Sequence, residues 1–332
     1  MPTSRFPQVV DLHNDLLTEL MHERERARSG GFAAHWLPQL RAGGVTVQVL
    51  PIFTEDYFAG EGALRRCLLI LDMAEELAAE HADSVAICRT AADLDATTAS
   101  GRIALILALE GLEPAGADLG VLRTLHRLGV RVASLTWNRR NMFADGLGEA
   151  ATNAGLTELG VAAVAEMARL GFVVDVSHLS EAGFWHVHEV ATRPYIASHS
   201  SCRAVCDHPR NLTDDQIRAL ASQGGVVGIN FYGEFVSDPP TQAGVIEHIV
   251  HALEVAGEDH VALGPDYVWD YFQTTDTKGM TDADFAKHMP AGLRRPDELP
   301  AVVELLVSAI GEPVAGKVAG GNALRVLREV LG

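Results

Sequence analysis

The chain has 332 residues, of which 48% are hydrophobic and 21% charged, so it can bury a large core and is not globally disordered. Its formal net charge of −18 argues against nucleic acid or an anionic membrane as a partner. No apolar stretch approaches the ~20 residues that cross a bilayer. The first strand-like run begins within about ten residues of the N-terminus, which leaves no room for a signal peptide. These features predict a cytoplasmic protein.

Strand-like apolar runs alternate with amphipathic, helix-type segments along the chain. The strand-like runs are continuous rather than alternating in polarity, which is typical of strands that are buried on both faces. The predicted strands are residues 8–13, 45–52, 103–109, 130–136, 172–177, 194–198, 225–231 and 260–265, and the clearest helices are 61–80, 118–128, 157–170, 181–191, 213–222 and 243–256.

Eight strands that alternate with helices predict parallel βαβ units, and right-handed crossovers close eight such units into a barrel. The predicted fold class is therefore α/β, a (β/α)8 TIM-type barrel, and residues 1–332 form a single domain. The segment 266–297 follows the last strand, is rich in Asp, Thr, Tyr and Pro, and is interpreted as a lid.

Metal-type side chains follow several of these strands at their C-terminal ends, where barrels of this kind build their active sites. Three imidazoles and two carboxylates suit one or two divalent ions of the zinc type. The five candidates are His13 and Asp15 after the first strand, Glu110 after 103–109, His178 after 172–177 and His199 after 194–198.

Each of these candidates has a plainer interpretation when it is taken alone. His13 and Asp15 form a short motif that chance or helix capping often explains, and Glu110 could instead pair with an arginine. A strand-end histidine is usually a satisfied core residue. Two successive strands that end in Ser-His, at His178 and His199, favour metal binding over that alternative.

Asp266 follows the eighth strand in Gly264-Pro265-Asp266. A carboxylate beside a metal-bound water can carry its proton, whereas a turn-forming aspartate after Gly-Pro is the simpler alternative. The only lysines are Lys278, Lys287 and Lys317, so no early strand offers a lysine that could be carbamylated to bridge two ions. Glu110 is the natural bridging candidate.

Several motifs in order resemble the membrane (renal) dipeptidase family, peptidase family M19 of the amidohydrolase-type barrels. The resemblance covers the chain from Val9 to about Leu331. It rests on 11–15 (DLHND), 108–111 (ALEG), 174–178 (VDVSH), 198–212 with its SHSS and RNL segments, 230–232 (NFY) and 264–266 (GPD).

The resemblance implies a binuclear zinc site and hydrolysis of dipeptides by a metal-bridging hydroxide. One ion is expected on His13, Asp15 and Glu110, and the other on Glu110, His178 and His199. Asp266 matches the proton-transfer aspartate, Arg210 matches the arginine that binds the substrate carboxylate, and Tyr232 matches a pocket position. The family also implies a homodimer.

Two positions depart from the family pattern. Trp137 stands where better-studied members have a substrate-binding histidine, and an indole N–H can donate one hydrogen bond but cannot become cationic. Trp137 itself, or Asn138 and its neighbours, are candidates to contact substrate instead. The segment 267–269 (YVW) replaces a common Phe-Asp-Gly after the proton-transfer aspartate.

The sequence supports three hypotheses about the function of the protein. The leading hypothesis is a zinc dipeptidase. The second is a metal-dependent hydrolase of another carboxylate-bearing amide, such as an N-acyl amino acid, a β-lactam or a dipeptide-like intermediate of secondary metabolism, which the substitution at Trp137 favours. The third is a non-catalytic metal-binding homologue, against which the intact ligand set argues.

Overall fold

The computed structural model describes residues 5–58, 60–274 and 281–332. Eight parallel strands follow one another in the order β1-β2-β4-β5-β6-β7-β8-β9, and β3 pairs with β4 outside this path. The strands are β1 (Val10–Asp11), β2 (Val47–Phe53), β3 (Val85–Ile87), β4 (Ile103–Glu110), β5 (Val130–Ser134), β6 (Val173–Asp175), β7 (Ile196–Ala197), β8 (Val226–Ile229) and β9 (Val261–Leu263).

The first and last strands meet and nearly close the sheet. The Leu12 N–H donates to the Leu263 carbonyl at 3.1 Å, and Asn14 forms a parallel bridge with Tyr267. The predicted (β/α)8 barrel is therefore confirmed. The eight predicted strands are all present, most of them shorter than expected, whereas β4 extends one residue farther, to Glu110; β3 was not predicted. It pairs with the first residues of β4 (Val85 with Ile103), on the edge that β5 occupies farther along.

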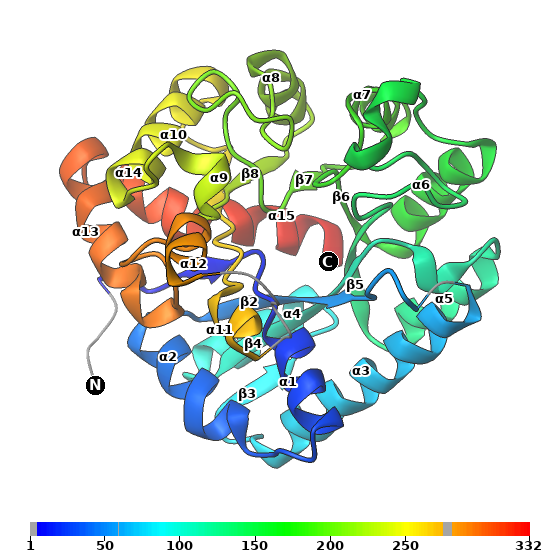
Figure 1. Ribbon diagram of the computed structural model, residues 1–332, viewed down its shortest axis with the longest axis horizontal. Coiled ribbons are helices and arrows are strands. Elements are labelled where there is room, and N and C mark those ends of the chain that lie inside the picture. The colour runs from blue at the N-terminus through cyan, green and yellow to red at the C-terminus, as the bar shows by residue number, and fades with distance from the viewer. Residues whose placement is uncertain (1–4, 59, 275–280) are drawn as a thin grey trace.

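Helices surround the barrel (Figure 1). The six predicted helices are found to within about one residue of the expected ends. None of the helices in the described ranges is long and apolar enough to cross a membrane. The helices are α1 (Leu16–Glu25), α2 (Leu37–Ala42), α3 (Glu61–Glu80), α4 (Ala91–Ala99), α5 (Leu119–Arg127), α6 (Glu158–Leu170), α7 (Glu181–Val190), α8 (Asp214–Ser222), α9 (Gly233–Val236), α10 (Gln242–Ala256), α11 (Trp269–Thr274), α12 (Asp282–His288), α13 (Leu299–Ile310), α14 (Glu312–Gly316) and α15 (Asn322–Leu331).

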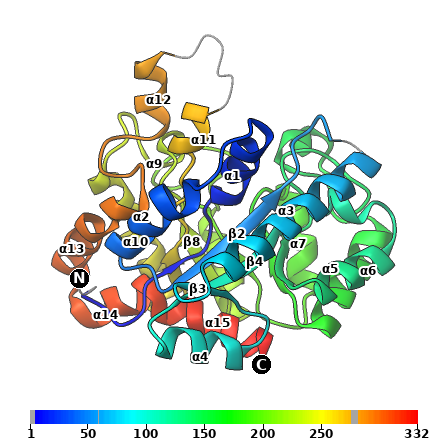
Figure 2. The same cartoon turned by 90° about the horizontal axis from the view of Figure 1, so that it is seen from below.

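Alternation along the strands divides the core into two layers. In β4, Ile103, Leu105, Leu107 and Leu109 pack outward against the helices, whereas Ala104, Ile106 and Ala108 pack inside the barrel. The inner cluster also contains the apolar face of α15, including Leu324 and Leu327. This helix lies at one end of the barrel, and α11 and α12 stand at the other (Figure 2).

The predicted lid, 266–297, includes α11 and α12, and its residues 275–280 lie outside the described ranges. Four of its residues, Asp266, Val268, Tyr271 and Phe272, line the large cavity at the mouth of the barrel. On α12, the His288 ring stacks on Tyr232, and the Tyr232 hydroxyl lies 2.8 Å from His288 Nδ1. The segment thus forms part of the cavity wall.

A buried carboxyl group lies under this segment. Glu19 on α1 is 4% exposed, and its Oε2 atom has no hydrogen-bond partner among the described residues. Burial, together with the nearby charges of Asp270 and Glu23, raises the pKa of Glu19 to about 8. Glu19 is therefore protonated in the folded protein at neutral pH.

We predict that replacing Glu19 with Gln makes stability less dependent on pH. The folded state keeps the Glu19 proton up to a pKa of about 8, whereas the unfolded state releases it near 4.5. Stability from this group is therefore fully present below pH 4.5 and is lost as pH rises through 8. The loss reaches as much as ~4–5 kcal/mol.

Urea unfolding of wild type and Glu19→Gln between pH 5 and 9 measures the difference. The control is Glu254→Gln, at an exposed position on α10. Equal pH slopes in wild type and Glu19→Gln would contradict the prediction.

Candidate metal centre and active site

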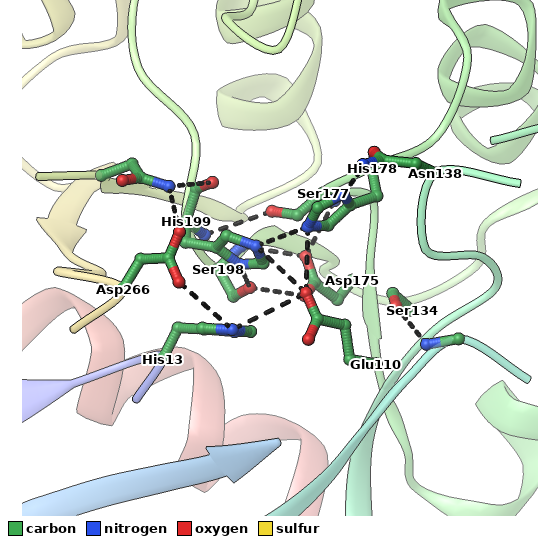
Figure 3. Close-up of polar contacts among 12 residues, drawn as sticks. His13, Glu110, Ser134, Asn138, Asp175, Ser177, His178, Ser198, His199 and Asp266 are labelled. Carbon is green, nitrogen blue, oxygen red and sulfur yellow. Dashed lines mark hydrogen bonds and ion pairs between the residues drawn. The ribbon is translucent and has the colours of Figure 1, made fainter. Parts of the chain in front are cut away.

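Metal-type side chains from β4 and the loops after β1, β6, β7 and β9 converge at the mouth of the barrel (Figure 3). Glu110 Oε1 lies 2.9 Å from His178 Nε2, 3.5 Å from His199 Nε2 and 3.7 Å from His13 Nε2. Glu110 is 7% exposed, and its only ion-pair partners among the described residues are these histidines. The alternative Glu–Arg pair is not found.

The outer nitrogens of two histidines are held by hydrogen bonds. His178 Nδ1 lies 2.8 Å from the Asn138 amide oxygen, which can only accept. His199 Nδ1 lies 2.7 Å from Ser198 Oγ, and that hydroxyl donates to Asp175 at 2.5 Å. Both Nδ1 atoms therefore carry the proton, and both Nε2 lone pairs point into the site.

These two lone pairs face each other, because His178 Nε2 and His199 Nε2 are only 2.9 Å apart. Two acceptor nitrogens at this distance repel unless a cation lies near both. The Nε2 atom of His13 is also buried and has no hydrogen-bond partner in the described part of the chain. The donor set therefore fits a divalent metal ion, because neutral imidazoles and a carboxylate are zinc-type ligands.

A second group of candidate ligands joins His13 to Asp15 and Asp266. Their ligand atoms lie within 4.8 Å of one another, as do those of His13, Glu110 and His199. His13 and Asp15 do not continue the strand, because β1 ends at Asp11 and Asp15 immediately precedes α1. The chain turns there, and Asp11 Oδ1 accepts the His13 N–H at 2.9 Å.

Burial controls the protonation of the centre. It raises the pKa of Glu110 and of Asp15 well above ordinary values, and the Asp266 charge raises both further. It lowers the pKa of His178 and of His199 well below the ordinary value, because charged imidazoles would lose their solvation. A bound cation reverses the effect on the carboxyl groups, because it favours their ionised form.

Asp266 occupies a strained position beside this cluster. Its φ of 61° lies in the left-handed region, as does the φ of 70° at His178. Strain of this kind is characteristic of functional positions. Asp266 Oδ1 lies 3.8 Å from His13 Nε2, and Oδ2 accepts a hydrogen bond from the Asn230 amide at 2.9 Å. Asn230 thus sets the direction of the carboxylate.

The sequence pattern did not predict a role for the polar residues Asp175 and Asn230, which lie beneath the candidate ligands. Asp175 accepts the backbone N–H groups of Ser177 and Ser198, each at 2.9 Å, and so joins the ends of β6 and β7. Asp175 occupies the inward position two residues beyond Val173 in β6. Asn230 occupies the inward position four residues beyond Val226 in β8, and both valines belong to the inner core. Period-two counting from the apolar inner face would have found them.

Arg210 is a buried cation without a carboxylate partner. It is 5% exposed, donates to Ser200 Oγ at 2.8 Å, and forms no ion pair within the described ranges. Its Nε and Nη2 atoms have no hydrogen-bond partner there. Burial lowers the pKa of Arg210, while the charge of Asp266 opposes that effect. Arg210 lines a small cavity that shares the His178 wall with the large one.

The large cavity has a volume of about 580 Å³ and lies against the candidate metal ligands. The predicted pocket residues Trp137, Asn138 and Tyr232 all line it, but their contacts differ. The Asn138 oxygen is engaged with His178, and the Tyr232 hydroxyl with His288. The residues that line this cavity include Asp15, Phe53, Glu55, Asp56, Glu110, Trp137, Asn138, His178, Tyr232, Glu234, Phe235, Asp266, Tyr271 and Phe272.

Comparisons with known proteins place the chain in a family. The model of the membrane dipeptidases, peptidase family M19, matches residues 4–331. An uncharacterized dipeptidase of Schizosaccharomyces pombe is 33% identical over 288 residues, covering 79% of this chain and 69% of that protein. Dipeptidase verJ of Clonostachys rogersoniana is 32% identical over 271 residues, covering 81% and 66%.

A solved structure has the same fold along nearly the whole chain. It is a metallo peptidase from Rhodobacter sphaeroides liganded with a phosphinate mimic of the dipeptide L-Ala-D-Ala, with a TM-score of 0.84 and 27% identity, covering 98% of this chain and 99% of that one. The chain belongs to the membrane dipeptidase family, peptidase family M19, and is a metallo-dipeptidase-type hydrolase.

We predict that Asn138→Ala weakens metal binding. Without the amide oxygen, the His178 ring loses the hydrogen bond that holds its Nδ1 proton and directs Nε2 inward. Losing such a partner typically costs about 10- to 100-fold in metal affinity. Zinc competition against a chromophoric chelator measures the change.

The matched control is Asn141→Ala, because Asn141 lies three residues farther along the same loop and contacts Glu113 and Leu135 rather than a histidine. Equal zinc affinities of wild type and Asn138→Ala would show that Asn138 does not orient His178.

Proposed function

We propose that this protein is a binuclear zinc dipeptidase in which Asp266 transfers the proton and Arg210 binds the carboxylate of the substrate. The observation that carries the proposal is the 2.9 Å approach of the His178 and His199 Nε2 atoms beside Glu110. His13, Asp15, Glu110, His178 and His199 would hold the ions. When bound, such ions polarise the scissile carbonyl and lower the pKa of a water molecule to near neutrality.

The surroundings of Asp266 support the proposed role in proton transfer. Its Oδ1 atom faces His13, and its Oδ2 atom is held by Asn230, so one carboxylate oxygen is directed at the metal ligands. In the proposed reaction, Asp266 accepts a proton from the attacking water and delivers it to the amide nitrogen as the C–N bond breaks. The products are two free amino acids.

The surroundings of Arg210 support its proposed role in binding a free C-terminal carboxylate. Two of its buried nitrogens lack a hydrogen-bond partner among the described residues, and an anion bound there would gain charge-assisted hydrogen bonds at a desolvated site. Ser200 holds the third nitrogen and orients the guanidinium. A free carboxylate one residue beyond the scissile bond characterises a dipeptide, whereas an internal peptide bond lacks it.

Hydrolysis of another carboxylate-bearing amide is the second candidate. It is favoured by Trp137, which lines the cavity where the family pattern has a histidine. Amino-acid release from a dipeptide panel, with zinc-loaded and chelated protein, separates the candidates. Chelator-sensitive release supports the dipeptidase. Failure to release amino acids from any dipeptide would overturn it, and turnover of N-acyl amino acids or β-lactams would then support the second candidate.

We predict that Asp266→Asn lowers kcat by roughly 10²–10⁴ and leaves the metal content unchanged. The amide keeps the size of the side chain but cannot accept the proton. Steady-state kinetics and metal analysis of the same preparations measure both quantities. Asp215→Asn, on the exposed surface of α8, serves as control. Wild-type turnover by Asp266→Asn would exclude the proposed role.

We predict that Arg210→Ala raises KM for dipeptides by about 10- to 100-fold, the range expected for lost hydrogen bonds to a charged group. Dipeptide amides, which lack the carboxylate, should be poor substrates for wild type and should be affected little by the substitution. An effect of Arg210→Ala on dipeptides that is absent for their amides identifies a direct contact between Arg210 and the substrate carboxylate. Equal losses for dipeptides and their amides would place the carboxylate elsewhere.

A further inference from the structure

Two aromatic side chains form one wall of the large cavity. Phe53 ends β2 and lies on the inward side of that strand, in register with Val47 and Val49 of the inner core. Trp137 follows β5, and its ring lies 5.1 Å from the Phe53 ring at an interplanar angle of 57°. The Trp137 ring is also 5.9 Å from the ring of His178. The wall therefore begins beside the candidate metal ligands.

The Phe53 end of this wall lies across the barrel mouth from Arg210, and Trp137 lies between the two. The strands β2 and β5 flank β4, which carries Glu110, whereas Arg210 follows β7, four strands away from β2 around the barrel. A dipeptide with its carboxylate at Arg210 and its amide carbonyl beside Glu110 must extend its amino-terminal residue away from β7. That residue then reaches the Phe53 and Trp137 rings.

Trp137 also lies at the boundary between the large cavity and a second cavity. A second cavity of about 430 Å³ shares Glu55, Asp56 and Trp137 with the first. The ion pair between Arg139 and Asp56, at 2.7 Å, stands at the same boundary. A large ring at position 137 therefore separates the two cavities and limits the depth available to a side chain.

We propose that Phe53 and Trp137 bind the side chain of the amino-terminal residue of the substrate and select aromatic or large aliphatic side chains there. The inference rests on the proposed dipeptidase function and on the Arg210 contact. Aromatic rings at these spacings prefer tilted or offset partners, which a phenyl or branched aliphatic group supplies. The indole cannot carry a charge, so it adds apolar surface and not a cation at this wall.

Kinetics of matched dipeptides test this pocket. Phe-Xaa, Leu-Xaa, Ala-Xaa and Gly-Xaa with one common second residue are compared in wild type, Trp137→Ala, Trp137→Phe and Phe53→Leu. Wild type should favour Phe over Gly in kcat/KM by at least roughly tenfold, since a single methylene in an apolar pocket changes this ratio by about 10- to 200-fold. Trp137→Ala should remove most of the preference, and Trp137→Phe should retain it.

Met142→Ala is the control, because Met142 is exposed and lines only the second cavity. Its selectivity should equal that of wild type. Circular dichroism and metal content identify any variant that fails to fold, and Phe53→Leu then tests the same wall. Unchanged selectivity in the folded variants, with dipeptides still hydrolysed, would overturn the pocket and leave the dipeptidase proposal standing.

Binding of uncleavable mimics separates the two proposals. Calorimetry with zinc-loaded protein compares two phosphinate isosteres of a dipeptide that differ only in a benzyl or a methyl group at the amino-terminal position. Tighter binding of the benzyl compound, lost in Trp137→Ala, supports the pocket even if no dipeptide is hydrolysed. Equal binding of both compounds, or binding of neither by wild type, would overturn it.

Discussion

The cost of burying charge at the barrel mouth is the constraint on which the site depends. Glu110, His13 and His199 are each less than 10% exposed and lie with their ligand atoms within 4.8 Å. Without a cation, burial raises the pKa of Glu110 and lowers that of His199, so it opposes charge on both groups, while the Nε2 lone pairs of His178 and His199 face each other. A divalent ion converts this repulsion into coordination, so the same burial that opposes charge favours metal.

The barrel supports this arrangement through the alternation of its strands. Inward positions change from small apolar residues to polar ones over a few residues, as from Ala108 to Glu110 in β4. Gly228 and Gly264 allow the neighbouring strands to approach closely, because a Cβ atom at either position would lie within 2.1 Å of the Ser198 carbonyl oxygen. The narrow interior lets Ser198 and Asp175 lie directly beneath the ligands and fix His199.

The sequence predicted the barrel and the convergence of its strand-end residues, because continuous apolar runs and parallel topology impose both. It did not predict where the loops turn. The left-handed backbone at His178, and the start of α1 directly after Asp15, depend on local hydrogen bonds that have no short sequence signal. The contact of His288 with Tyr232 joins residues 56 apart, and only the fold brings them together.

Different parts of the barrel mouth hold the candidate metal ligands and form the walls of the cavity. The candidate ligands lie at the end of β4 and in the loops after β1, β6 and β7, and hydrogen bonds to Asn138 and Ser198 hold two of the histidine rings. The walls of the cavity include Phe53, Trp137, Tyr271 and Phe272, and the Phe53 and Trp137 rings lie 5.1 Å apart. Substitutions in these walls can therefore change which side chains fit while the metal ligands keep their positions. Trp137 touches both parts, because its ring lies beside His178 and also closes the pocket.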